Sequence, residues 1–142
     1  SMSCFRKKGA HPVARIEIVD DDAEFADSVA AILTKAGHQV RILQTTENAT
    51  QALLRDQPDL VFLDVMFADN PVAGFELARQ VRREKHLKGL PVILLTAVNE
   101  RFPMAFSTDD IDPDWLPVQG YIEKPVDAKQ LLRVVRKLVP AA

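Results

Sequence analysis

The stretch RIEIVDDDAEF, residues 15–25, decides the fold. A largely apolar run, residues 16–19, ends in three consecutive carboxylates, Asp20, Asp21 and Asp22. The apolar run is typical of a buried strand, whereas like charges about 4 Å apart repel by about 4 kcal/mol per pair at an effective dielectric constant of about 20. The cluster is tolerable at the end of a strand if a divalent cation supplies the missing positive charge.

Strand and helix patterns alternate along the rest of the chain. We expect strands at 16–20, 38–43, 60–64, 91–97 and 120–124, and helices at 22–38, 46–57, 75–85 and 126–139. In the first helix, the spacing places one apolar face on Phe25, Val29, Ile32, Leu33 and Ala36. This alternation predicts an α/β fold, a doubly wound five-stranded parallel sheet with helices on both faces. Such sheets bind ligands at the carboxyl ends of their strands.

The amino-acid composition and net charge exclude several classes of function. The chain has 142 residues, of which 47% are apolar and 27% charged, as expected of one globular domain. Its net charge of −2 gives no reason to expect direct nucleic-acid or membrane binding, and no apolar run is long enough to cross a bilayer. The single Cys4 excludes an internal disulfide and fits a cytoplasmic location.

The domain organisation follows from the same pattern. We expect residues 1–14 to be a flexible N-terminal arm in which Ser1 before Met2 is typical of a cloning scar. Residues 15–139 form the expected domain, with no output domain after it.

Chemically useful side chains stand where the expected strands end. Asp20 and Asp21 close the first strand, Asp64 the third, Thr96 the fourth and Lys124 the fifth. Carboxylates can hold Mg²⁺, and Asp64 is a candidate nucleophile that could form an acyl phosphate. Phosphoryl transfer needs mainly positioning and charge neutralisation, which a cation, an ammonium and a hydroxyl group can supply.

Four motifs in this order resemble the receiver domains of two-component response regulators. They are IVDDD at 18–22, PDLVFLDVM at 58–66, PVILLTA at 91–97 and YIEKPV at 121–126. The resemblance implies a flavodoxin-like sheet with strand order 2-1-3-4-5. It also implies the following roles: Asp64 as phosphoacceptor, Asp21 as direct Mg²⁺ ligand, Asp20 as ligand through water, the Met66 carbonyl as a further ligand, Thr96 and Lys124 as phosphoryl contacts, Thr96 and Tyr121 as switch residues, and a cis Lys124–Pro125 bond.

The function implied is a phosphoacceptor switch that takes a phosphoryl group from a sensor histidine kinase or a phosphotransfer protein. It would change binding to an unknown downstream protein, as a monomer or weak dimer, and would catalyse only its own phosphorylation and slow dephosphorylation. One alternative is a pseudo-receiver, a protein-interaction module independent of phosphorylation. A haloacid-dehalogenase-like phosphatase would need a second Asp where Met66 stands. A flavodoxin-like cofactor binder would need a phosphate loop where this chain has Asp20–Asp22.

Some of these residues also have plain structural interpretations. The acids at 20–22 could cap the helix that follows, which is our interpretation of Asp22. Asp64 could be an ordinary strand-end residue, and Thr96 and Lys124 could each be structural or solvated. Tyr121 could be a core aromatic residue without a switching role.

Two regions depart from the family pattern. Ala68 stands where most relatives have proline, and Gly74 lies ten residues after Asp64 instead of eight, which predicts a two-residue insertion beside the site. Segment 99–119 contains three prolines, so we expect the fourth helix to be shortened or replaced by an irregular loop. Its aromatic residues either pack over the sheet edge or dock a partner: Phe102, Phe106 and Trp115.

The resemblance to receiver domains also implies that Met66 and Val98 tune the lifetime of the phosphoryl group. They lie two residues after Asp64 and Thr96, and both are apolar. Neither can orient an attacking water by a hydrogen bond, which predicts slow dephosphorylation.

Overall fold

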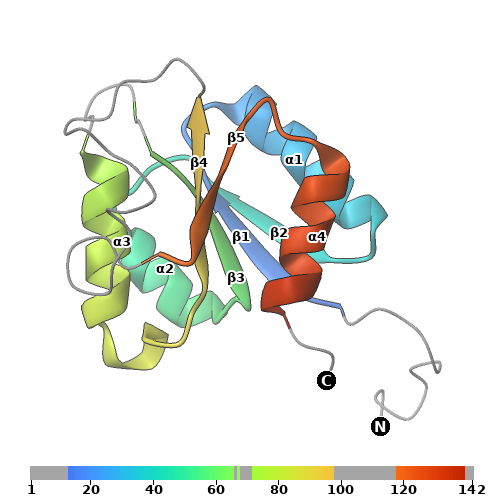
Figure 1. Ribbon diagram of the computed structural model, residues 1–142. Helices are drawn as coiled ribbons and strands as arrows, with labels where there is room; N and C mark the ends of the chain where they lie inside the picture. Colours follow the sequence, from blue (N-terminus) through green and yellow to red (C-terminus); the bar gives the residue numbers. More distant parts are fainter. Residues whose placement is uncertain (1–12, 66, 68–71, 98–117, 140–142) are drawn as a thin grey trace, which may run out of the picture.

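The computed structural model describes residues 13–65, 67, 72–97 and 118–139, and all structural statements concern these ranges. They contain one parallel sheet of five strands in the order β2-β1-β3-β4-β5, which confirms the predicted topology (Figure 1). The strands are β1 (Arg15–Val19), β2 (Gln39–Leu43), β3 (Leu60–Asp64), β4 (Val92–Ala97) and β5 (Gly120–Lys124).

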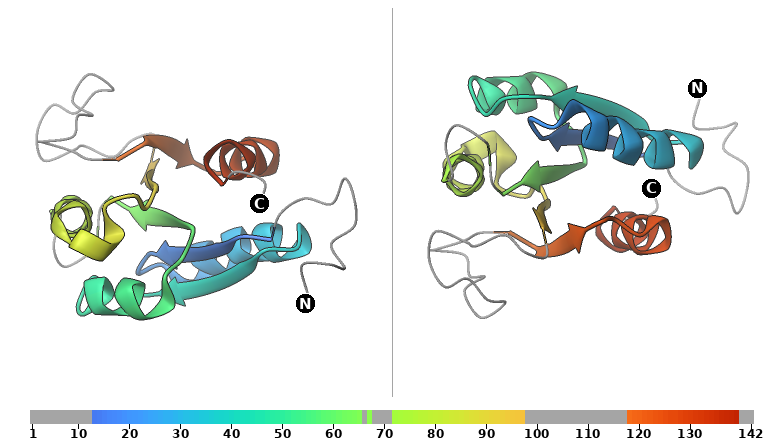
Figure 2. Two further views of the ribbon diagram at one scale, coloured as in Figure 1. Left: turned by 90° about the horizontal axis from the view of Figure 1, so that it is seen from below. Right: turned by 90° about the horizontal axis from the view of Figure 1, so that it is seen from above.

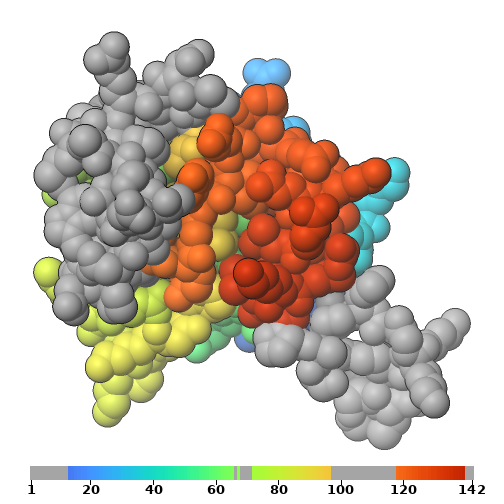
Figure 3. Space-filling model, in the orientation of Figure 1, coloured from blue at the N-terminus to red at the C-terminus, as the bar shows by residue number. Residues whose placement is uncertain are grey.

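Helices cover both faces of the sheet. The α-helices are α1 (Ala23–Lys35), α2 (Ala49–Asp56), α3 (Ala73–Arg83) and α4 (Ala128–Leu138), and a short 3₁₀ helix, η2 (Lys85–Leu87), follows α3. Figure 2 shows α1 and α4 against one face and α2 and α3 against the other. Figure 3 shows β5 and α4 side by side at the surface. Within the described ranges, we find no helix long and apolar enough to span a membrane.

The central strand β3 separates two apolar cores. All five residues of LVFLD are buried because helices cover both sides of the strand. Leu63 packs with α2 and α3, whereas Phe62 packs with Leu33 of α1 and Leu131 of α4. The continuous apolar run predicted a strand covered on both faces, and the structure confirms this prediction.

The first helix, α1, begins at the predicted N-cap Asp22, but it ends at Lys35, three residues before the predicted end. The Asp22 carboxylate accepts a hydrogen bond from the Phe25 backbone N–H at 3.1 Å, so Asp22 is the N-cap. Gly37 follows the helix with a φ of 99°, a conformation that favours glycine.

The predicted apolar face of α1 is confirmed except at Ala36, and it also includes Ala26. The buried residues are Ala26, Val29 and Leu33, while Phe25 and Ile32 are half-buried and Ala36 is exposed. Ala36 is already the C-cap, and the small Ala26 allows the first turn of the helix to approach the sheet closely.

Several sequence predictions lie outside the described residues. They concern most of the N-terminal arm, Met66 and Ala68 in the loop after β3, and most of the segment between β4 and β5, with Val98, Phe102, Phe106 and Trp115. The interpretations of the shortened fourth helix, the docking aromatics and the rate-tuning pair stay predictions.

Gly74 lets α3 approach the end of β3. A Cβ atom built at Gly74 would lie 2.8 Å from the Val65 carbonyl oxygen and closer still to that of Asp64. These are backbone atoms, so they cannot turn aside as a flexible side chain would. Despite the inserted residues predicted before it, this glycine packs directly against the strand end that carries Asp64.

We therefore expect Gly74→Ala to lower the free energy of unfolding by about 1–3 kcal/mol, because overpacking outweighs the better helix propensity of alanine. Urea denaturation measures the change. Gly89→Ala is the control, since a Cβ there would have nothing within 4 Å. Equal midpoints for the two variants would contradict the close approach.

Candidate functional site

Three carboxylates meet at the carboxyl ends of β1 and β3. Asp20 is fully buried and Asp64 is 2% exposed, whereas Asp21 is exposed. An oxygen atom from each of the three lies within 4.8 Å of the others. The parallel pairing of β1 with β3 brings these residues together although they are more than 40 positions apart in the sequence.

Lys124, the last residue of β5, reaches across to two of these acids. Its Nζ lies 3.2 Å from Asp64 Oδ1 and 3.4 Å from Asp20 Oδ2. Burial lowers the pKa of Lys124, but the charges of Asp64 and Asp20 more than offset this, so its pKa is raised overall. Lys124 therefore stays an ammonium and partly neutralises the acidic cluster.

Asp20 is the most constrained of the three acids. Burial raises its pKa, while a hydrogen bond from the Asp22 N–H at 2.9 Å and the charge of Lys124 oppose the change. The backbone N–H of Asp20 also donates to the Leu43 carbonyl of β2 at 2.9 Å. The Asp20 carboxylate is thus buried and in contact with the Asp22 N–H and Lys124.

Phe25 was not among the residues predicted for the site. The Lys124 ammonium lies 4.2 Å from the centroid of its ring, within the range of a cation–π interaction. The Asp22 cap holds the first turn of α1, which places the half-buried ring beside β5. The sequence placed Phe25 on a core-facing stripe, and no local pattern indicated that β5 would bring Lys124 to it.

The arrangement fits a hard divalent cation. Mg²⁺ takes oxygen ligands, and three carboxylate groups lie close together here, two of them in contact with Lys124. A bound divalent cation would relieve the repulsion among the carboxylates. Asp21 is exposed, so a cation can reach it from solvent.

Of two other predicted site residues, Thr96 lies at the same end of the sheet, whereas Tyr121 lies near the start of β5. Thr96 is 2% exposed near the end of β4, in register with Glu123 of β5. Tyr121 of β5 is half-buried and packs against the core on the α2 and α3 side. The Lys124–Pro125 bond is cis, as predicted. The roles of Thr96 and Tyr121 in switching stay predictions.

Comparison with known proteins agrees with this geometry. Residues 16–136 match the family described as the response regulator receiver domain. The chain belongs to this family. A putative response regulator from Chloroflexus aurantiacus has a solved structure with a TM-score of 0.76 and 26% identity, covering 90% of this chain and 98% of that one.

The curated relatives of this receiver domain differ in length. It is 32% identical over 127 residues to the transcriptional regulatory protein GltR of Pseudomonas aeruginosa, covering 89% of this chain and 49% of that protein. It is 28% identical over 130 residues to the protein PilH of the same organism, covering 89% of this chain and 98% of that one. The receiver domain thus spans about half of the transcriptional regulator and almost all of PilH.

In metal-free solution, we expect Asp64→Asn to raise the free energy of unfolding of this receiver domain by about 1–3 kcal/mol. Asp64 is repelled by the carboxylates of Asp20 and Asp21, and Lys124 keeps Asp20 as a partner after the change. Thermal unfolding in EDTA measures the difference.

The control is Asp27→Asn, because Asp27 is exposed on α1. A melting temperature of Asp64→Asn below that of the wild type, with Asp27→Asn unchanged, would show that the pair with Lys124 outweighs the repulsion.

Proposed function

We propose that this receiver domain is a phosphoacceptor switch, with Asp64 accepting a phosphoryl group from a sensor histidine kinase or a phosphotransfer protein. One observation carries the proposal: in a chain of this family, Asp20, Asp21, Asp64 and Lys124 meet at the carboxyl edge of the sheet. Asp20, Asp21, Asp64 and the Met66 carbonyl would hold Mg²⁺. A bound Mg²⁺ would neutralise charge on the phosphoryl oxygens.

The chemistry follows from the nucleophile and its neighbours. An Asp64 carboxylate oxygen attacks phosphorus as the bond from phosphorus to the donor nitrogen breaks, and an acyl phosphate results. The electrons of the broken bond stay with the donor imidazole, which takes a proton. Lys124 lies 3.2 Å from Asp64 and is placed to donate to a phosphoryl oxygen. The Thr96 hydroxyl would donate to another.

The product is a changed binding surface rather than a released metabolite. Hydrolysis of the acyl phosphate would end the signal, so the domain would catalyse only its own phosphorylation and slow dephosphorylation. The alternative is a pseudo-receiver that binds partners without phosphorylation. The complete set of acids and the lysine in contact with them favour the phosphoacceptor.

The proposal also covers the partners of the domain, its oligomeric state and its location. Like GltR, whose name describes a transcriptional regulator, this domain would work in a signalling pathway. A net charge of −2 supports a protein target rather than direct nucleic-acid binding. We propose a monomer or weak dimer in the cytoplasm, where its phosphoryl donors would act.

Incubation with acetyl phosphate and Mg²⁺ should add the mass of one phosphoryl group to the wild-type protein. Asp64→Asn should gain none, since the nucleophile is lost, and Asp21→Ala should gain little at the same Mg²⁺ concentration. Intact-protein mass spectrometry follows the reaction.

Asp27→Ala is the matched control, because it removes an exposed acid of α1 instead of one at the site. An unmodified wild type, tested also with a phosphorylated phosphotransfer protein as donor, would favour the pseudo-receiver.

Phe25→Leu should slow phosphorylation by acetyl phosphate about two- to fivefold, because Lys124 loses the ring that holds its ammonium in place. Phe25→Tyr keeps an aromatic face and should react at nearly the wild-type rate. The initial rate at saturating Mg²⁺ is the measurement. Equal rates for the leucine and tyrosine variants would mean that the ring acts only by its bulk.

A further inference from the structure

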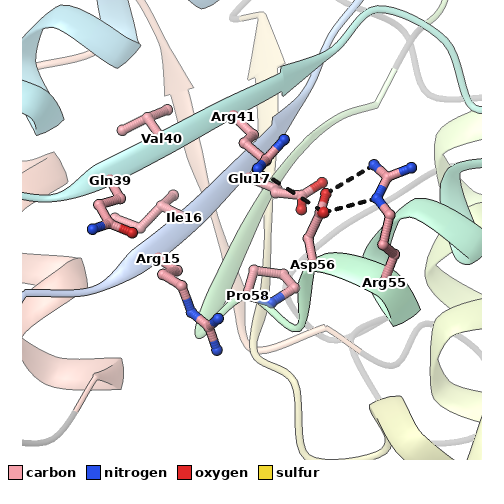
Figure 4. A pocket seen from close by; sticks show the side chains of 9 residues that line it. All are labelled: Arg15, Ile16, Glu17, Gln39, Val40, Arg41, Arg55, Asp56 and Pro58. Carbon is pink, nitrogen blue, oxygen red and sulfur yellow. Dashed lines mark hydrogen bonds and ion pairs between the residues drawn. The ribbon is translucent and has the colours of Figure 1, made fainter.

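A second group of charged residues lies away from the phosphorylation site. It lines a hollow of about 630 Å³ between the first halves of β1 and β2 and the end of α2. Figure 4 shows the side chains that line this hollow. The polar lining includes Glu17 of β1, Arg41 of β2, and Arg55 and Asp56 of α2. None of these residues has a part in the proposed phosphoryl transfer.

Glu17 is an unusual residue for its position. It lies in the middle of β1, in register with Val61 of the central strand, and is 1% exposed. As an ionised carboxylate it would have no hydrogen-bond donor for either oxygen among the described residues. A buried charge without a partner is strongly unfavourable, so such a group takes up a proton.

The two arginines beside Glu17, Arg41 and Arg55, contact Asp56 instead. Arg55 Nε lies 3.0 Å from Asp56 Oδ1 and its Nη2 lies 3.2 Å from Asp56 Oδ2. Arg41, opposite Glu17 in register on β2, has its Nε 3.9 Å from Asp56 Oδ1. Arg15 donates instead to the Gln57 carbonyl at 2.8 Å, and its backbone N–H donates to Asp59.

Figure 4 shows the carboxyl groups of Glu17 and Asp56 facing each other between Arg41 and Arg55. Two ionised carboxylates cannot bond to each other, because neither has a hydrogen atom to donate. A single proton on Glu17 removes the repulsion and provides a donor for Asp56.

We infer that Glu17 and Asp56 form a proton-binding site, in which protonated Glu17 donates a hydrogen bond to the Asp56 carboxylate and fastens the end of α2 to β1. The site would hold its proton at neutral pH and lose it in alkaline solution. The bond joins the last residue of α2 to the strand that directly precedes Asp20. This inference does not depend on the proposed function, and either can fail alone.

The surroundings of the two acids shift their pKa values in opposite directions. Burial, followed by the hydrogen bond and the charge of Asp56, raises the pKa of Glu17 to about 8. The hydrogen bond from Arg55, followed by that from Glu17, lowers the pKa of Asp56 to about 2. The proton therefore resides on Glu17, and the arginines keep Asp56 as the acceptor.

The direction of the pH effect follows from linkage. An unfolded chain releases the Glu17 proton near the ordinary value of 4.5, whereas the folded chain keeps it until about 8. The contribution of Glu17 to stability therefore falls as pH rises through this window and becomes constant above it. Asp56 acts in the opposite sense, since its contribution is complete above 3.8 and is lost as pH falls toward about 2.

Glu17→Gln is the decisive variant, because glutamine has a similar shape and can donate to Asp56 but does not titrate. Its melting temperature should match the wild type at about pH 5 and exceed it by a margin that grows up to about pH 8. NMR titration of the wild-type Glu17 carboxyl carbon should give a midpoint well above that of an ordinary glutamate. A constant difference in melting temperature, or an ordinary midpoint, would overturn the inference.

The Asp56→Asn variant tests whether Asp56 is the partner of the Glu17 proton. It removes the neighbouring charge and leaves Arg41 and Arg55 available to Glu17, so the Glu17 midpoint should fall but stay above the ordinary value because burial is its largest cause. An unmoved midpoint would mean that Asp56 does not share the proton. Glu47→Gln, at an exposed residue before α2, controls for the loss of a surface carboxylate and should keep the wild-type pH dependence.

Discussion

The contact of Lys124 with Asp64 and Asp20 is the interaction on which the site depends. It spans the sheet from the end of β5 to the ends of β3 and β1, and both acids are almost fully buried. Without the ammonium, these carboxylates would repel one another in a region of low dielectric constant. The lysine lowers this repulsion without removing it, which leaves the cluster stable enough to fold and still suited to a cation and a phosphoryl group.

The surrounding structure holds this contact in place. The parallel register sets Asp64 and Lys124 at the ends of their strands, and Gly74 lets α3 pack against the Asp64 backbone. Asp22 caps α1 and so presents the Phe25 ring to the lysine. A residue interpreted only as a helix cap thus contributes indirectly to the geometry of the site.

The sheet also carries acidic residues in two different electrostatic settings. At the carboxyl ends of the strands, a lysine and solvent access for Asp21 favour charged carboxylates. In the middle of β1, Glu17 is buried, while the nearby arginines bind Asp56. The same type of side chain is therefore suited to binding a metal ion in one place and a proton in the other, because hydration and cationic partners differ.

The sequence by itself determined the sheet topology, the strand-end acids, Lys124, the Asp22 cap and the cis Lys124–Pro125 bond. These features follow from local periodicity and from motifs whose order is enough to identify the family. The tertiary structure alone decided that Phe25 meets Lys124, that Gly74 touches the end of β3, and that Glu17 faces Asp56. Each depends on the packing of segments distant in sequence, and burial and pKa depend on all the neighbours that such packing brings together.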